Sequence, residues 1–150
     1  MPMTDIRFYH LLSTPLERAL PQLLERAYSA DFRVVVKASD DAQVDALNAL
    51  LWTYTPNSFL PPGSRKDGEP SRQPIFLTGQ DENPNAATLL AVTDGSTPAS
   101  FDGYARVLDL FDGQDEAAVA AARQRWKAYK DAGHSLQYWQ QTETGWEQKA

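Results

Sequence analysis

The fold of this 150-residue chain is read most directly from one short run, Phe32-Arg33-Val34-Val35-Val36-Lys37-Ala38. Three consecutive valines favour a strand, because β-branched side chains pack well on a pleated surface. A run that is apolar without alternation is typical of a strand buried on both faces, as in parallel sheets. Ser39 and Asp40 follow, and either side chain is able to cap a helix. The run therefore predicts a buried strand followed by a helix.

Strand and helix patterns alternate on both sides of this run. Apolar residues at helical spacing predict helices over residues 15–30 and from Asp40 to about Trp52. Pro21 lies inside the first of these and predicts a kink or a late helix start. A long last helix is predicted from Asp115 to about Ala132, capped by Asp112 and closed by Gly133. Further strands are predicted at residues 6–12, 74–78, 87–92 and 103–111, with a weaker signal at 135–141.

This alternation predicts an α/β fold in which residues 1–150 form a single domain. The expected architecture is a mostly parallel central sheet with helices on both faces. Residues 53–74 interrupt the pattern with many prolines and glycines. Such a long break is unusual in a compact domain, and residues 63–73 within it are predicted to form a mobile loop.

Composition excludes several functional classes. The chain has no cysteine, which removes disulfides and thiolate chemistry. No apolar run approaches the roughly 20 residues that span a bilayer, and the N-terminus lacks a signal-peptide pattern. We therefore expect no membrane association and a cytoplasmic location. A formal net charge of -6 disfavours broad or sequence-specific nucleic-acid binding, because an acidic surface repels the phosphate backbone.

Catalytic and cofactor motifs are missing from the sequence. No glycine-rich GxGxxG turn follows an early strand, and there is no Walker lysine. His10 and His134 lack the spacing of known metal sites. We therefore expect no catalytic residue, no metal and no cofactor. One alternative stays open, a nucleotide- or cofactor-dependent α/β transferase with carboxylates at strand ends, near Asp40-Asp41 or Asp94. Helix caps and turns explain the same aspartates.

The last predicted helix carries the run Ala122-Arg123-Gln124-Arg125-Trp126-Lys127-Ala128-Tyr129-Lys130, with four cations and no acid. At about 100° per residue, one side of the helix holds Arg123, Trp126, Lys127 and Lys130, and Arg125 points away. In one interpretation Trp126 belongs to the core and the cations stabilise the helix dipole. In the other, this side binds an acidic peptide that ends in an aromatic or apolar group.

A second segment with large aromatic residues leads into the proline-rich break. Trp52 ends the second helix, and Phe59 follows within the sequence Ser58-Phe59-Leu60-Pro61. Both aromatics either anchor the loop to the core or contribute to a protein interface, where such side chains dominate the binding energy.

These segments, in this order, resemble the chi subunit family of bacterial DNA polymerase III over nearly the whole chain. The resemblance rests on Leu51-Trp52 with Ser58-Phe59-Leu60-Pro61, on Arg106-Val107-Leu108-Asp109 and on the run from Ala122 to Lys130. One departure is Pro62, where the family pattern has histidine, so no role for an imidazole is expected there.

The resemblance implies a Rossmann-like α/β fold without a phosphate loop. It also implies a non-catalytic accessory subunit of the clamp loader, a replisome adaptor within the DNA polymerase III holoenzyme. Its expected partners are the psi subunit and the acidic C-terminal tail of single-stranded-DNA-binding protein, whose last residue is Phe. The implied tail-binding residues are Arg123, Trp126, Lys127 and Lys130, with Phe111 lining the apolar part of the pocket. The residues implied to face psi are Trp52 and Phe59.

Overall fold

The computed structural model describes residues 4–12, 16–53, 62–64, 67–93, 95, 97–98, 101, 103–142 and 145–150. Helices and strands alternate along most of the chain, as the sequence predicts. In order they are β1 (Asp5–Leu11), α1 (Leu16–Ser29), β2 (Val34–Lys37), α2 (Asp41–Thr53), β3 (Pro62–Gly63), the 3-10 helix η2 (Pro70–Arg72), β4 (Ile75–Thr78), β5 (Leu89–Val92), β6 (Arg106–Asp112), α3 (Glu116–Asp131), β7 (Ser135–Gln141) and β8 (Trp146–Gln148).

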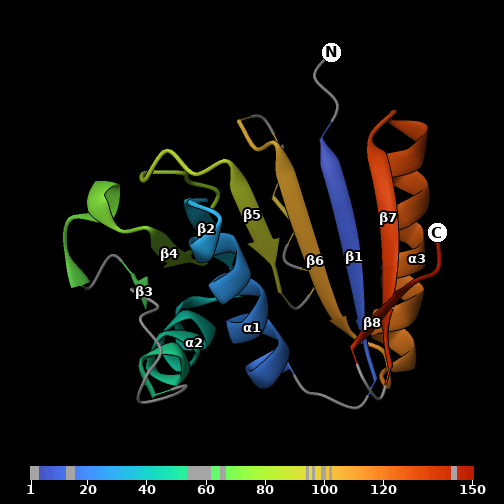
Figure 1. The fold of residues 1–150 in the computed structure, drawn as a ribbon, viewed down its shortest axis with the longest axis horizontal. Coiled ribbons are helices and arrows are strands. Elements are labelled where there is room, and N and C mark those ends of the chain that lie inside the picture. The colour runs from blue at the N-terminus through green and yellow to red at the C-terminus, as the bar shows by residue number, and fades with distance from the viewer. Residues whose placement is uncertain are drawn as a thin grey trace.

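The strands form one twisted sheet in the order β3-β4-β2-β5-β6-β1-β7-β8 (Figure 1). Neighbouring strands run parallel except β7 and β8, which form an antiparallel pair. The predicted α/β class with a mostly parallel sheet is therefore confirmed.

The valine run of β2 lies where the sequence places it, between two other buried strands. Val35 pairs with Phe76 of β4 on one side and with Leu90 of β5 on the other. All three residues are at most 1% exposed. Burial on both faces explains why this strand is apolar without alternation.

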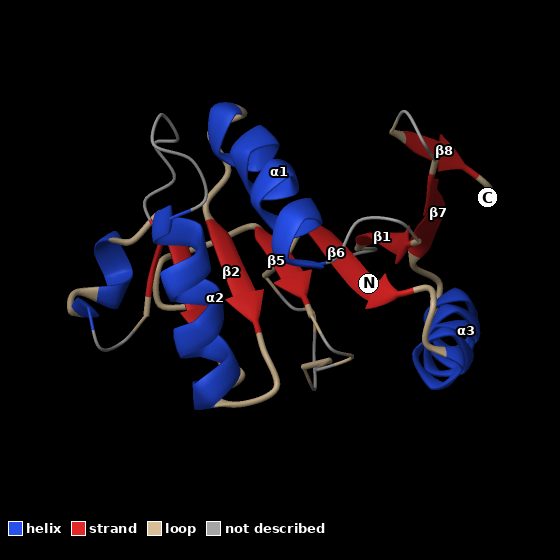
Figure 2. Ribbon diagram, turned by 90° about the horizontal axis from the view of Figure 1, so that it is seen from below, coloured by secondary structure: helices blue, strands red, loops and turns tan. Residues whose placement is uncertain are grey.

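Helices cover both faces of the sheet (Figure 2). Helices α1 and α2 pack in one apolar cluster with side chains such as Val34, Val36 and Leu110. The opposite face carries a second cluster, in which Ile6 and Phe8 contact residues of α3. None of the α-helices in the described part of the chain combines the length and the apolar character needed to cross a membrane.

Two details at helix ends correct the sequence predictions. The cap of α3 is Asp115, whose side chain accepts from the backbone N–H of Ala117 and Ala118, whereas Asp112 accepts from Gln114 one turn earlier. Helix α1 begins at Leu16, so a late start caused by Pro21 is wrong. Of the two caps that the sequence allows for α2, Ser39 and Asp40, the structure shows Asp40, whose side chain accepts a 2.8 Å bond from the Gln43 N–H.

The proline-rich break contains more regular structure than its composition suggests. Strand β3 and helix η2 lie within it, and neither was predicted. Strand β8 was also missed, and β6 begins at Arg106, three residues later than predicted. The mobility of residues 63–73 stays a prediction.

The connections after β1 and β6 diverge, although these strands are neighbours. Strand β1 leads into α1 on one face, whereas β6 leads into α3 on the other. In open α/β sheets, ligands bind where neighbouring connections part in this way, at the carboxyl ends of the strands. His10 and Phe111 lie opposite each other at this end of β1 and β6.

Candidate functional site: the basic side of helix α3

One of the four cations of α3 is used inside the fold. Arg125 donates from Nε to Asp109 Oδ2 at 2.8 Å and from Nη2 to Asp109 Oδ1 at 3.0 Å. Burial raises the pKa of the Asp109 carboxyl, and the hydrogen bonds and charge of Arg125 oppose that rise. The sequence predicts that Arg125 points away from the other three cations of α3. The structure explains this, because the Arg125 side chain reaches beneath the helix to Asp109 of β6.

Trp126 lies at the border between the core and the surface. Its ring meets Phe8 at 5.5 Å and Tyr138 at 5.8 Å between centroids, edge to face in both cases. The residue is only partly buried, whereas Ala122 one turn earlier is 2% exposed. Trp126 therefore holds α3 on the sheet and leaves part of its side chain exposed to solvent.

The other three cations of α3 are exposed. Arg123, Lys127 and Lys130 follow one another along the helix at spacings of four and three residues, which places them on one side. Burial lowers the pKa of His10 and raises that of Tyr138, and the charge of Arg123 adds to the first effect and opposes the second. Arg123 thus lies near the carboxyl ends of β1 and β7, while Lys130 in the last turn also favours the helix dipole.

Phe111 forms the floor of this area. It is 4% exposed, and its ring lies 6.3 Å from Phe8, 6.2 Å from Tyr138 and 5.1 Å from His10. The structure therefore connects Phe111 with Trp126 through the rings of Phe8 and Tyr138. Phe111 is too deeply buried to offer much surface of its own.

Sequence reasoning missed two residues here, His10 and Tyr138. His10 Nδ1 and the Tyr138 hydroxyl share a hydrogen bond. Burial lowers the pKa of His10, and Arg123 adds to this effect. Gly113 packs so closely that a Cβ there would overlap the His10 ring. The alternation of Leu136, Tyr138 and Gln140 was the one available signal.

Trp52, the first aromatic of the second segment, lies on a different helix from this site. Trp52 lies in the last turn of α2, and Phe59 falls outside the described residues. Helices α2 and α3 lie on opposite faces of the sheet (Figure 2). The α2 end and the basic side of α3 are therefore separate parts of the molecule.

The carboxylates of the alternative hypothesis have a different setting. Asp40 caps α2, and Asp94 falls outside the described residues. A pocket of about 320 Å³ lies beside the end of β4, with Asp41, Asp45 and Glu82 in its lining. Within the described ranges, no three histidine or carboxylate side chains gather closely enough to hold a metal ion.

Basic, aromatic and apolar side chains thus meet at the outer side of α3, an arrangement suited to a peptide with acidic and aromatic groups.

Comparisons with known proteins show which family the chain resembles. The model of the family "DNA polymerase III chi subunit, HolC" matches residues 3–137.

Three curated proteins illustrate the similarity. "Probable DNA polymerase III subunit chi" of Rickettsia prowazekii is 36% identical over 90 residues, 60% of this chain and 54% of that protein. The DNA polymerase III subunit chi of Pseudomonas aeruginosa is 28% identical over 90% of this chain and 95% of its own. The DNA polymerase III subunit chi of Escherichia coli is 22% identical over 81% of this chain and 82% of that protein. The chain therefore belongs to the DNA polymerase III chi subunit family, and its role is that of an accessory subunit of the replisome.

Proposed function

We propose that this protein is a non-catalytic adaptor that links the clamp-loader complex, through psi, to the acidic C-terminal tail of single-stranded-DNA-binding protein. One observation supports the tail site above others. Arg123, Lys127 and Lys130 are exposed beside the half-buried Trp126, while Arg125 is committed to Asp109. Within the described part of the chain no ion pair holds these three cations, and their position next to an aromatic ring on a chain of net charge -6 favours a small and specific anionic partner.

Each part of the tail has a counterpart on α3. Tail carboxylates pair with Arg123, Lys127 and Lys130, and the terminal Phe ring packs against Trp126 above the Phe111 floor. Arg123 has the planar fork that binds a carboxylate through two bonds, whereas the lysines act as point charges. Exposed ion pairs of this kind contribute only about 0.2–1 kcal/mol each, so the affinity is modest and falls as salt is added.

A modest affinity is sufficient for an adaptor. Linkage raises the effective concentration of the polymerase machinery at coated single strands, and this effect needs no tight contact. On the proposed psi side, Trp52 and Phe59 supply the large aromatic side chains that dominate protein interfaces. The position of Trp52 on α2, across the sheet from α3, is compatible with simultaneous binding of both partners.

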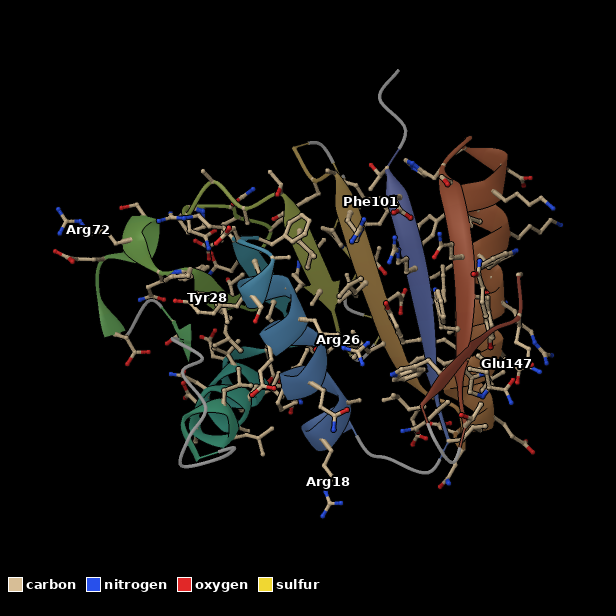
Figure 3. The ribbon with its side chains drawn as sticks, in the orientation of Figure 1. Arg18, Arg26, Tyr28, Arg72, Phe101 and Glu147 are labelled. Carbon is tan, nitrogen blue, oxygen red and sulfur yellow. The ribbon has the colours of Figure 1, made fainter. Side chains whose placement is uncertain are left out.

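The tail site is tested by calorimetric titration with a short acidic peptide ending in Asp-Ile-Pro-Phe and with the same peptide lacking the Phe. We expect binding of the first peptide only, and a higher Kd in Arg123→Ala and in Lys127→Ala, by up to about fivefold for each exposed ion pair removed. Arg72→Ala is the matched control, because it removes one exposed cation from η2, far from α3 (Figure 3). Equal binding in all variants would disprove the assignment.

The psi side is tested by co-purification. Phe59→Ala should weaken recovery of psi and leave the peptide affinity unchanged. Loss of both activities in a variant that is still folded by circular dichroism would contradict the two-surface model.

The transferase alternative has its own test. Native mass spectrometry of the purified chain would detect a nucleotide or cofactor bound near the pocket beside β4. We expect the mass of the polypeptide alone, and a stoichiometric small-molecule adduct would favour the enzyme.

A further inference from the structure

Strand β1 carries polar residues on the face that is turned away from α3. Interior strands of parallel sheets are usually apolar on both faces. In β1, Ile6 and Phe8 enter the core beneath α3, whereas Asp5, Arg7 and Tyr9 alternate with them and point to the other face. Figure 1 shows α1 in front of the sheet on the β5 and β6 side, and no helix in front of β1 and β7.

Three arginines border this part of the sheet, where Tyr9 is 8% exposed beneath the partly buried Trp139 and Trp146. Arg7 Nη2 and Arg106 Nε both bond to the same oxygen, Asp5 Oδ2, each at 3.3 Å. A guanidinium has five N–H donors, and among the described residues the contacts with Asp5 occupy one donor of Arg7 and one of Arg106, while Arg7 also hydrogen-bonds to Tyr9. The side chains of Arg7 and Arg106 remain 24% and 33% exposed. Arg26, an exposed residue of α1, projects towards the same area (Figure 3).

The three positive charges converge on one phenol. Arg7, Arg106 and Arg26 each oppose the rise that burial causes in the pKa of Tyr9. Arg7 and Arg106 are held together by the shared Asp5 oxygen, and Arg26 adds a third positive charge near the same phenol. Asp5 offsets one of the three charges, and the surplus favours an anionic occupant.

Aromatic rings border the arginines and orient them. The Arg106 guanidinium lies over the Phe32 ring at 5.6 Å, a cation–π contact that holds the fork in place. At the other end, Trp146 of β8 packs edge-on against Tyr9 at 5.1 Å. Pre-oriented arginines lose less side-chain freedom when they bind, which favours affinity.

We propose that this surface, the β1 arginine face (Arg7, Arg26, Arg106 and Trp146, above the buried Tyr9), binds a short acidic segment of a partner protein. Carboxylates match the fork of a guanidinium, and a few of them balance the local surplus of charge. A nucleic acid carries one phosphate per nucleotide and would extend beyond this small face. Its outer phosphates would then meet the rest of the protein, whose net charge of -6 repels them. The face lies across the sheet from α3, so it is independent of the proposed tail site.

The test uses the full chain with Arg123→Ala and Lys127→Ala in place, so that the tail site is disabled. The probe is an acetylated, amidated hexaglutamate peptide, which has no aromatic end. Titration at low salt, followed by nuclear magnetic resonance, should give saturable shifts of the Arg7 and Arg106 Nε–H and the Trp146 indole N–H. Arg7→Gln with Arg106→Gln should raise the Kd about tenfold or more, the equivalent of about 1.4 kcal/mol.

Four further measurements keep this proposal falsifiable. Arg7→Lys keeps the charge and should weaken binding less than Arg7→Gln, and Arg72→Gln should leave the Kd unchanged. Each variant is first shown to unfold at the parental temperature, within about 4 °C for a neutral surface change. Absence of saturable shifts, or a Kd that the double variant leaves unchanged, would overturn the proposal. Tighter binding of a six-nucleotide single strand at the same residues would replace the acidic peptide with nucleic acid.

Discussion

Arg125 and Asp109 form a two-bonded ion pair beneath α3, with the Asp109 side chain only 2% exposed and the Arg125 side chain 15% exposed. Their bonds join the middle of α3 to the middle of β6. This pair explains why one of the four cations in the Ala122–Lys130 run belongs to the fold, whereas Arg123, Lys127 and Lys130 are exposed.

Arg125→Met should destabilise the protein strongly. The substitution leaves the buried Asp109 carboxylate without a partner, which costs about 3–5 kcal/mol. Urea unfolding at neutral pH measures the loss. Lys127→Ala, an exposed change on the same helix, should stay within about 0.5 kcal/mol of the parent. Similar losses in both variants would contradict a structural role for Arg125.

The cost of Arg125→Met should also depend on pH. Because burial raises the pKa of Asp109 in the folded protein, the folded state holds more protons than the unfolded state just above the ordinary value of about 3.9. The free energy of unfolding therefore falls as pH rises from the ordinary pKa of the carboxyl to its higher pKa in the folded protein. Removal of Arg125 raises the folded-state pKa of Asp109 further and extends this pH range upwards. We expect the difference between variant and parent to be smaller at about pH 5 than at neutral pH. A difference that does not change with pH would show that the lost packing, and not the charge, dominates.

Asp115→Ala should weaken α3 locally. It removes the acceptor for the N–H groups of Ala117 and Ala118, a loss of about 1 kcal/mol for a helix cap. Asp112→Ala removes a bond to Gln114 outside the helix and is the matched control, with a smaller expected effect. Urea unfolding distinguishes the two, and a larger loss for Asp112→Ala would restore the original prediction that Asp112 is the cap.

His10 should report occupancy of the tail site. The positive charge of Arg123 contributes to the lowered pKa of His10. A bound carboxylate neutralises that charge, so the peptide should raise the pKa of His10, and by linkage bind more tightly as pH falls through it. The imidazole is titrated by nuclear magnetic resonance with and without peptide. In Arg123→Ala the pKa of His10 should already be higher in the protein without peptide. If the peptide leaves the pKa of His10 in the parent protein unchanged, His10 does not sense the tail site.

Local sequence patterns were sufficient for most of the fold. The valines of β2, the Asp40 cap and the Gly133 end of α3 all act within a few residues, and each was predicted correctly. Gly133 adopts a φ of 89°, a left-handed conformation that suits glycine. Strand β8 was missed because it is short and depends on pairing with β7.

The site was predicted less completely, because its contacts join distant parts of the chain. Helical spacing separated Arg125 from Arg123, Trp126, Lys127 and Lys130, but no pattern in α3 names Asp109 as its partner. His10 and Tyr138 are 128 residues apart and meet only because β7 pairs with β1. Parallel register of this kind depends on tertiary packing and leaves little trace in either strand.

Mapping the bound tail on the protein tests the proposed adaptor most directly. The acidic peptide ending in Asp-Ile-Pro-Phe is titrated into the isotopically labelled chain, and backbone amide shifts are followed. We predict saturable shifts along Arg123–Lys130 and at Tyr138, with the amides of β4 and α2 unmoved, and loss of all these shifts in Arg123→Ala with Lys127→Ala. Saturable shifts centred on α2, β4 or the β1 arginine face, with α3 unmoved, would contradict the assignment of the tail site to α3.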